Sequence, residues 1–347
     1  MVYFGKIFSR MRRNLALVFL VALSVMGWSS CKKKVYTVPT LQVFRQTLST
    51  SSLLDVEFDY KECTGYVISS HEIFKTIDTG SHWRKLLFAD TNIVLQKLCV
   101  MDSTIVYVLA HNATYNKNII YRTQDAGATF QVVNGGLYDY RAMEFVSPNI
   151  GYMESGGSVN ATVNGGASWN STPGFPAGNL CDLIEFKDLT SGFAMSFASN
   201  QLFMTTTGGN TWYTMAYSNA NSFRDVKYSK HGDHVIAKAA GTSDNGWFVT
   251  ADFGLNWTGA KNLYIDGMKD EKHPIMDVAD MYDERGYGAG NHNLFYTKDG
   301  GYNWEPRYDQ NGASLPETFT ELYAARADKA YVTTKEGTLI TVTFGNQ

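Results

Sequence analysis

The chain has 347 residues, of which 18% are charged and 14% are aromatic, and its 31 glycines far outnumber its 7 prolines. This composition is too apolar and aromatic for a disordered chain, and it excludes collagen and coiled coils. Residues 1–30 contain four bases and no acid, so the rest of the chain carries 26 bases and 33 acids, a net charge of −7. An acidic balance of this kind argues against nucleic acid as a partner.

The first 30 residues have the order of an export signal. Lys6 to Arg13 form a basic segment, and Leu15 to Trp28 form an apolar run of fourteen residues, which is short of the ~20 that span a membrane. Two serines and Cys31 follow, and this order resembles a bacterial lipoprotein signal. We therefore expect residues 1–30 to be a signal peptide and Cys31 to be lipidated, which makes the protein an exported, membrane-anchored lipoprotein of the cell envelope.

An ordinary cleavage site is the alternative for this segment. The stretch Gly27-Trp28-Ser29 has the small-x-small pattern of such a site, and Trp28 stands where lipoprotein signals usually have a leucine. Cleavage there would leave Cys31 unmodified.

The other three cysteines, Cys63, Cys99 and Cys181, are widely spaced and form no CxxC pair. This spacing indicates neither a zinc site nor a disulfide framework. We interpret them as small buried hydrophobic residues, and one disulfide among them stays open as an alternative.

A repeat of about 44 residues runs through the rest of the chain. Six segments share the pattern Thr-x-Asp-x-Gly-x-x-aromatic, with Asn or Thr replacing Asp in two of them, and their aromatic residues are 47, 39, 43, 45 and 47 positions apart. The pattern is that of the Asp-box, or BNR repeat, a hairpin in which the acid accepts backbone N–H bonds and the glycine takes a positive φ. We interpret the acids as hairpin closures and the tryptophans as packing between sheets: Asp78, Asp125, Asn164, Asp252 and Asp299, with Trp83, Trp169, Trp212, Trp257 and Trp304.

Short strand-like runs precede each box. Before the first box they are Leu53–Phe58, Gly65–Ser69 and Glu72–Thr76, and turn residues separate them. Four short antiparallel strands per repeat, repeated at this period, are typical of propeller blades. Residues 51–347 are therefore predicted to form an all-β, seven-bladed β-propeller of four-stranded antiparallel blades.

The seventh unit supplies only three strands, within residues 319–323, 330–333 and 338–341. We expect Leu41–Arg45 to provide the fourth, so that residues 31–50 hold the lipidated start, a short linker and a strand that closes the ring. Pairing the two ends of the chain in one blade removes two free sheet edges.

These units resemble the photosystem II stability/assembly-factor family of propellers over about residues 51–345. The resemblance rests on the boxes and on the Gly-Tyr pairs, such as Gly65-Tyr66 and Gly286-Tyr287, that open the second strand. It implies a non-catalytic binding scaffold or assembly factor with no cofactor and no bound metal. The Cys-Lys-Lys-Lys start at Cys31 is similar to that of Bacteroidetes secreted proteins, which argues against a photosynthetic role.

A glycoside hydrolase is the alternative function, because other Asp-box proteins are sialidases or xyloglucanases. Sialidases need an Arg-Ile-Pro signature and three clamping arginines, and this chain has no Arg-Ile-Pro. Xyloglucanase-type enzymes use two facing propellers. A lone pair of carboxylates would still suffice for hydrolysis, so the alternative stays open.

The innermost strands are expected to place one column of residues around the central channel: Asp55, Gln96, Ala142, Leu183, Asp225, Asp277 and Glu321. Either these acids satisfy backbone groups, or they form a rim that receives a protein or glycan partner. The candidate rim is Asp55, Arg141, Arg224, Asp225, Asp277 and Glu321, together with the long loop from Asn262 to Pro274.

A second column lies in the turns after the second strands: His71, His111, Ser158, Asn200, Thr242, His292 and Glu336. Histidine and carboxylate are zinc ligands, but turns on separate blades are too far apart to share one ion. We interpret the histidines as surface residues and expect no metal site.

Overall fold

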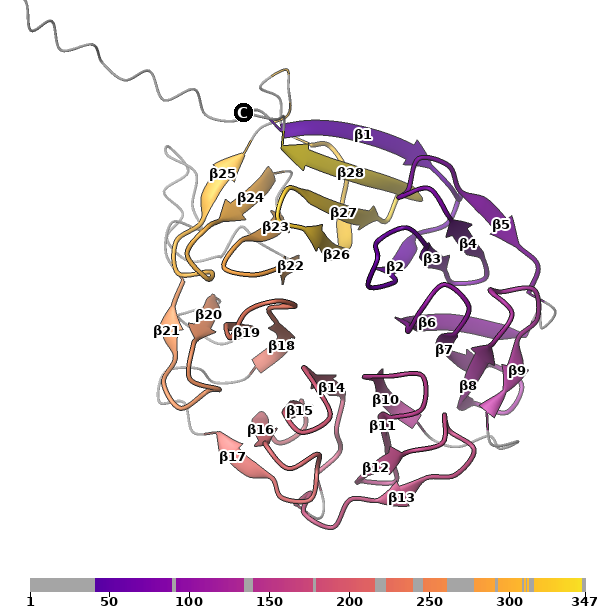
Figure 1. Ribbon diagram of the computed structural model, residues 1–347, viewed down its shortest axis with the longest axis vertical. Coiled ribbons are helices and arrows are strands. Elements are labelled where there is room, and N and C mark those ends of the chain that lie inside the picture. The colour runs from indigo at the N-terminus through magenta and orange to yellow at the C-terminus, as the bar shows by residue number, and fades with distance from the viewer. Residues whose placement is uncertain are drawn as a thin grey trace, which may run out of the picture. The chain divides into compact units, whose positions relative to one another are not determined.

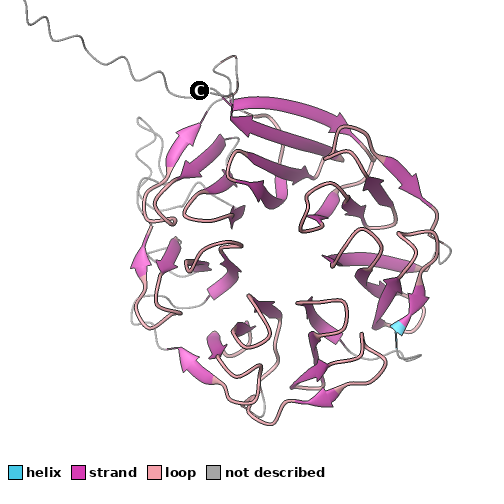
Figure 2. Cartoon of the chain, in the orientation of Figure 1, coloured by secondary structure: helices cyan, strands magenta, loops and turns pink. Residues whose placement is uncertain are grey.

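The computed structural model describes residues 41–344 except 89–91, 134–139, 177–178, 216–222, 240–245, 261–277, 291–292, 308, 310 and 312–314. The chain divides into two units, Met1–Pro39 and Thr40–Gln347, and every described residue lies in the second. That unit is a ring of seven four-stranded antiparallel sheets around a central channel (Figures 1 and 2), which confirms the predicted propeller. No helix among the described residues is long and apolar enough to cross a membrane.

Each of the first six blades consists of four consecutive strands, and the first strand of each is innermost (Figure 1). Blades 1 to 3 contain β2 (Leu53–Phe58), β3 (Gly65–Ser69), β4 (Ile73–Thr76), β5 (Arg84–Leu86); β6 (Ile93–Val100), β7 (Val106–Asn112), β8 (Lys117–Thr123), β9 (Gln131–Val132); and β10 (Tyr140–Phe145), β11 (Gly151–Ser155), β12 (Ser158–Thr162), β13 (Asn170–Ser171). Blades 4 to 6 contain β14 (Leu183–Phe186), β15 (Gly192–Ser196), β16 (Gln201–Thr205), β17 (Tyr213–Met215); β18 (Phe223–Tyr228), β19 (Val235–Ala239), β20 (Trp247–Thr250), β21 (Thr258–Gly259); and β22 (Val278–Met281), β23 (Gly286–Gly290), β24 (Asn293–Thr297), β25 (Glu305–Arg307).

Blade 7 joins the two ends of the propeller. It contains β26 (Phe319–Arg326), β27 (Lys329–Thr334), β28 (Thr338–Phe344) and, outermost, β1 (Leu41–Thr47). β1 pairs with β28 from Leu41↔Phe344 to Thr47↔Thr338. This confirms closure by the N-terminal strand, which is two residues longer than predicted because its ladder continues to Thr47.

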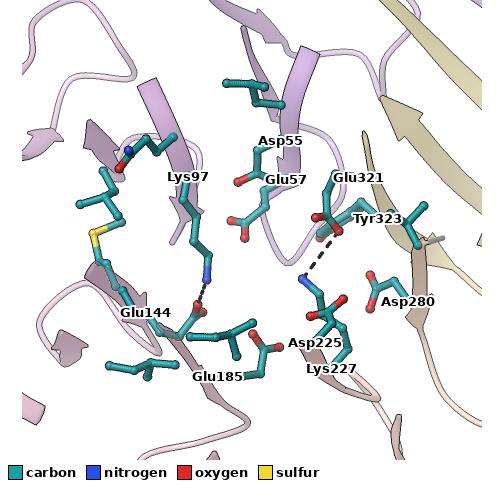
Figure 3. Close-up of a pocket in the computed structure, with 18 of the residues that line it drawn as sticks. Asp55, Glu57, Lys97, Glu144, Glu185, Asp225, Lys227, Asp280, Glu321 and Tyr323 are labelled. Atoms are coloured by element: carbon teal, nitrogen blue, oxygen red, sulfur yellow. Dashed lines mark hydrogen bonds and ion pairs between the residues drawn. The ribbon is translucent and has the colours of Figure 1, made fainter. Parts of the chain in front are cut away.

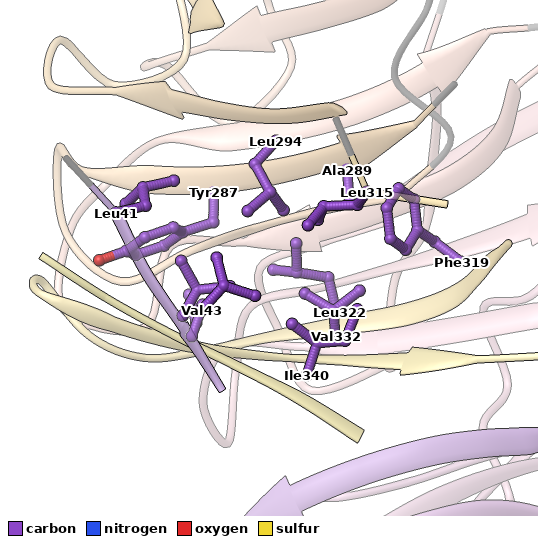
Figure 4. Close-up of a cluster of buried hydrophobic side chains, with 13 residues drawn as sticks. Leu41, Val43, Tyr287, Ala289, Leu294, Leu315, Phe319, Leu322, Val332 and Ile340 are labelled. Carbon is purple, nitrogen blue, oxygen red and sulfur yellow. The ribbon is translucent and has the colours of Figure 1, made fainter. Parts of the chain in front are cut away.

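The core is divided into seven apolar clusters, each shared by two neighbouring blades. The cluster between blades 6 and 7 includes Leu41 and Val43 of β1, packed near Tyr287 and Leu294 (Figure 4). In every cluster that holds a box aromatic residue, that residue contacts the preceding blade. Trp304, for example, is fully buried with Ile236 of blade 5. Burial of apolar surface therefore holds each blade to the next around the ring.

Close packing explains the glycine that opens the second strand of several blades. A Cβ on Gly65 would lie 2.4 Å from the Phe58 ring, and a Cβ on Gly192 would lie 2.5 Å from the Phe186 ring. The aromatic residue at the end of the innermost strand thus occupies the space that any larger residue would need.

Candidate functional site

The box acids are bonded within their own hairpins. Oδ1 of Asp78 accepts hydrogen bonds from the Thr76 hydroxyl (2.8 Å) and from the backbone N–H of His82 (2.9 Å). The same pair of bonds recurs at Asp125, Asn164, Asp252 and Asp299, and the Thr207 hydroxyl accepts from the backbone N–H of Thr211 (2.9 Å). The bonds from Thr129 and Thr123 lower the pKa of Asp125 to about 2. These carboxylates are committed to hairpin structure.

The central channel is a cavity of about 1210 Å³ lined by the innermost strands of all seven blades. Pairing with the second strands defines two sets of equivalent positions, two residues apart on each innermost strand. The first ring is Asp55, Lys97, Ala142, Leu183, Asp225, Val278 and Glu321. The second ring is Glu57, Cys99, Glu144, Glu185, Lys227, Asp280 and Tyr323.

The predicted column matches the first ring in five blades and is displaced by one residue in two. Lys97, not Gln96, occupies the position in blade 2, and Val278 occupies it in blade 6. Asp277 lies outside the described residues. The column placed Gln96 and Asp277 one residue too far from the start of the second strand, since Lys97 and Val278 are the residues three positions before the end of the pairing between the first two strands.

Sequence reasoning missed the charged residues of the second ring. Glu57, Glu144, Glu185, Lys227 and Asp280 all line the cavity (Figure 3). The signal that would have found them is the period of two in a strand, because a side chain two residues further on lies on the same face.

Three of the ring acids connect neighbouring blades, and we call them the blade-to-blade carboxylates. Asp55 Oδ2 accepts from the backbone N–H of Leu98 (2.7 Å), and Glu57 Oε2 accepts from that of Val100 (2.7 Å). Asp280 Oδ2 accepts from the backbone N–H of Ala324 (2.9 Å). Each donor lies on the innermost strand of the following blade, so these carboxylates satisfy backbone groups that face the channel.

Lysines pair with two of the four remaining ring acids and with Asp280. Lys97 Nζ lies 2.6 Å from Glu144 Oε2, and Lys227 Nζ lies 3.7 Å from Glu321 Oε1 (Figure 3). Lys230 Nζ lies 2.9 Å from Asp280 Oδ2. Within the described part of the chain, no hydrogen bond or ion pair reaches the carboxylates of Glu185 and Asp225.

Burial raises the pKa of several of the channel acids. It raises the pKa of Glu185 to about 7 and that of Glu321 to about 7, while Lys227 opposes the change in both. Burial and the neighbouring charge of Asp55 raise the pKa of Glu57. Burial alone would lower the pKa of Lys227, but the surrounding carboxylates, Glu321 first, raise it above its usual value.

The two arginines of the candidate rim line the same cavity. Arg141 Nη1 lies 3.5 Å from Asp182 Oδ1, and the Arg224 guanidinium lies 5.2 Å from the centre of the Phe197 ring. Asp55, Asp225 and Glu321 also line the cavity, so five of the six rim residues come together there. The loop from Asn262 to Pro274 lies outside the described residues.

Only some residues of the column predicted for the turns after the second strands lie in such turns. His71 is exposed in the turn after β3, but His111 belongs to β7, because the β7–β8 hairpin of blade 2 is longer than in the other blades. Thr242 and His292 lie outside the described residues. In the described ranges, no group of three or more His, Cys, Asp or Glu side chains is placed to hold a metal ion. Cys63 is exposed, and the two other described cysteines are buried; all three are free thiols.

Comparison with solved structures finds propellers of the same kind at low sequence identity. A structure described as YCF48 bound to D1 peptide has a TM-score of 0.68 at 14% identity, covering 88% of this chain and 96% of that one. YCF48 from Cyanidioschyzon merolae has a TM-score of 0.68 at 14% identity, covering 87% and 99%. The GH74 enzyme of Niastella koreensis has a TM-score of 0.64 at 15% identity, covering 85% of this chain but only 53% of the enzyme. These likenesses show the fold.

No curated protein matches the chain. The family model described as photosynthesis system II assembly factor YCF48 matches residues 41–343, which span the propeller from its closing strand β1 into its last strand β28. The chain therefore belongs to the family of YCF48-type assembly-factor propellers.

Proposed function

We propose that this propeller is a non-catalytic binding scaffold of the cell envelope that recognises a protein partner on its channel face. The observation that carries the proposal is the cavity of about 1210 Å³, to which every blade contributes a side chain. Its lining residues stand on a closed ring of paired strands, so they are held in place before a partner arrives. A preorganised surface of this kind loses little conformational entropy on binding.

The family supports a protein partner over a glycan. Its model is described as an assembly factor, and one propeller of the same fold was solved with a bound D1 peptide. The glycoside hydrolase alternative rests on the GH74 likeness, and nearly half of that enzyme has no counterpart in this chain. Three of the channel carboxylates are also bonded to backbone amides, which leaves fewer acids free for proton transfer.

Capture from an envelope extract, beside a glycosidase panel, tests the proposal. The variant is Glu185→Gln with Asp225→Asn, because neither carboxylate has a hydrogen bond or ion pair in the described structure and both changes preserve shape. Wild type should capture a partner that mass spectrometry identifies, and the double variant should bind the purified partner at least ~10-fold more weakly.

The matched control for this experiment is Asp299→Asn. It alters a box acid that does not line the cavity, and Asn164 already occupies that box position in blade 3. The control should bind like wild type. Equal binding by the double variant would remove the channel face as the binding site, and hydrolysis abolished by the double variant would establish the enzyme instead.

We also propose that lipid on Cys31 anchors the propeller to a membrane. The support is the order of basic, apolar and small residues before this cysteine. Mass spectrometry of the N-terminal peptide from the native host should find Cys31 as the first residue, with acyl chains attached. A peptide that begins at Ser30, with an unmodified cysteine, would contradict the anchor.

A further inference from the structure

One ammonium group serves several acids on one side of the channel. Lys227 Nζ lies 3.7 Å from Glu321 Oε1 (Figure 3). The negative charges of Asp225, Glu185 and Asp280 also attract this ammonium group and raise its pKa. Asp280 has its own cation, Lys230, and two backbone N–H donors. Asp225, Glu185 and Glu321 are therefore left to share Lys227.

Among the described residues of the neighbouring blades, the cations nearest this group already have carboxylate partners. Lys97 acts on Glu185, but it is already paired with Glu144 at 2.6 Å. Lys187 is paired with Asp233, Arg141 with Asp182, and Lys230 with Asp280. The other charged and titratable groups that line the cavity are Asp55, Glu57, Glu144, Arg224, Tyr228, Lys238 and Tyr323.

Three carboxylates that share one ammonium group in a confined space repel one another unless one or more of the carboxylates binds a proton. We propose that Glu185 and Glu321, which line the channel beside Lys227, form a proton-sensitive pair that switches the charge of the channel. Neighbouring acids repel the ionised form of both residues. Glu144 and Asp280 have this effect on Glu185, and Asp225 and Asp55 have it on Glu321. Burial raises the pKa of each to about 7, which places the change within the physiological range.

The switch adds two negative charges to the channel as the pH rises. Each carboxyl releases its proton to solvent, and the lysines keep theirs because the acids raise the pKa of Lys97 and Lys227. The switch acts in the protein alone, so it stands or falls separately from the proposed function.

Carboxyl carbon NMR of the full chain, labelled at glutamate, tests the proposal between pH 4 and pH 9. The signals of Glu185 and Glu321 should titrate with midpoints near 7 and are assigned by their loss in Glu185→Gln and Glu321→Gln, and Glu57, whose pKa is also raised, is assigned by its loss in Glu57→Gln. Glu284→Gln is the matched control, because Glu284 is exposed in the turn between β22 and β23. The signals of Glu185 and Glu321 should be unchanged in this control. Midpoints of 5 or below for both channel residues would overturn the switch.

Replacing the shared cation provides a second test. Lys227→Gln removes the charge that favours ionised Glu185 and Glu321, so both midpoints should rise further. A residue that is buried but not coupled to Lys227 would keep its midpoint. Unchanged midpoints in this variant would contradict the shared ammonium. If Lys227→Gln does not fold, Lys227→Met, which keeps an unbranched apolar side chain without the charge, takes its place.

The free energy of unfolding should also depend on pH in a defined direction. The ordinary glutamate pKa is 4.5, so between about pH 4.5 and 7 the folded state binds more protons than the unfolded state. Stability is therefore lost as the pH rises through this window, and each carboxyl should change the unfolding constant on the order of 100-fold. Urea unfolding at pH 5.5 and pH 8 should show this loss in wild type and in Glu284→Gln, and a much smaller one in Glu185→Gln/Glu321→Gln. Equal losses in all three proteins would overturn the switch.

Discussion

Removal of β1, residues 41–47, should give a protein that aggregates or melts far below the wild type. The deletion breaks a seven-residue ladder with β28 and removes Leu41 and Val43 from the cluster between blades 6 and 7. It also leaves β28 as an exposed edge, which is a template for pairing with another chain. Size-exclusion chromatography and thermal unfolding measure the effect. A chain that begins at Thr40 keeps β1 and is the control; a deletion variant as stable as this control would show that the ring closes in another way.

A pair of adjacent substitutions separates the packing of β1 from its hydrogen bonds. Val43 is 6% exposed, whereas Phe44, the next residue, is 56% exposed. Val43→Asp buries a charge and should destabilise the blade strongly, while Phe44→Asp should change the melting temperature little. Equal effects of the two substitutions would contradict the placement of β1.

Replacement of Trp304 by alanine should cost about 3–5 kcal/mol of unfolding free energy, the range for a fully buried large aromatic residue. Trp304 is 0% exposed, and its indole N–H donates to the carbonyl of Gly301 at 2.8 Å. Trp83, the equivalent residue of blade 1, is only partly buried, so Trp83→Ala should cost clearly less. Denaturant titrations followed by circular dichroism measure both. A cost for Trp83→Ala that equals or exceeds that of Trp304→Ala would contradict this ranking.

Asp299, the acid of the same box, should contribute less to the free energy of unfolding than Trp304. Asp299→Ala removes the bonds from Thr297 and Asn303 and should cost about 1–3 kcal/mol, because a hairpin donor and a hydroxyl are left without their acceptor. Partner binding should be unchanged, since Asp299 does not line the cavity. Loss of binding with normal stability would show that the box has a functional role.

Repetition made the fold predictable from sequence. Each box is a local structure, in which Thr76 and Asp78 bond to groups at most four residues away, so six copies in register indicate blades without knowledge of their contacts. The closing strand followed from the blade count, because the seventh unit lacked one strand.

The channel was only partly predictable because its geometry depends on several blades at once. The inferred column was displaced by one residue at Gln96 and Asp277, because the register between the first two strands is fixed by pairing that the sequence does not show. The ion pairs of the channel join residues that are far apart in the sequence. Lys227 lies on blade 5 and Glu321 on blade 7, so the repeat pattern alone does not predict that they meet. A single sequence also gives no basis for ranking Trp304 above Trp83, because their exposure depends on the neighbouring blade.

The blade-to-blade carboxylates are unevenly distributed around the ring. Asp55 and Glu57 bond blade 1 to blade 2, and Asp280 bonds blade 6 to blade 7, the blades on either side of the seam where the two ends of the propeller meet. In the described structure, no innermost-strand carboxylate of blades 3, 4 or 5 bonds to an amide of the following blade. The junctions between blades 1 and 2 and between blades 6 and 7 are thereby more strongly joined than those that follow blades 3, 4 and 5, where local opening of the ring should begin. The amides of Leu98, Val100 and Ala324 should accordingly be among the last to exchange with solvent deuterium.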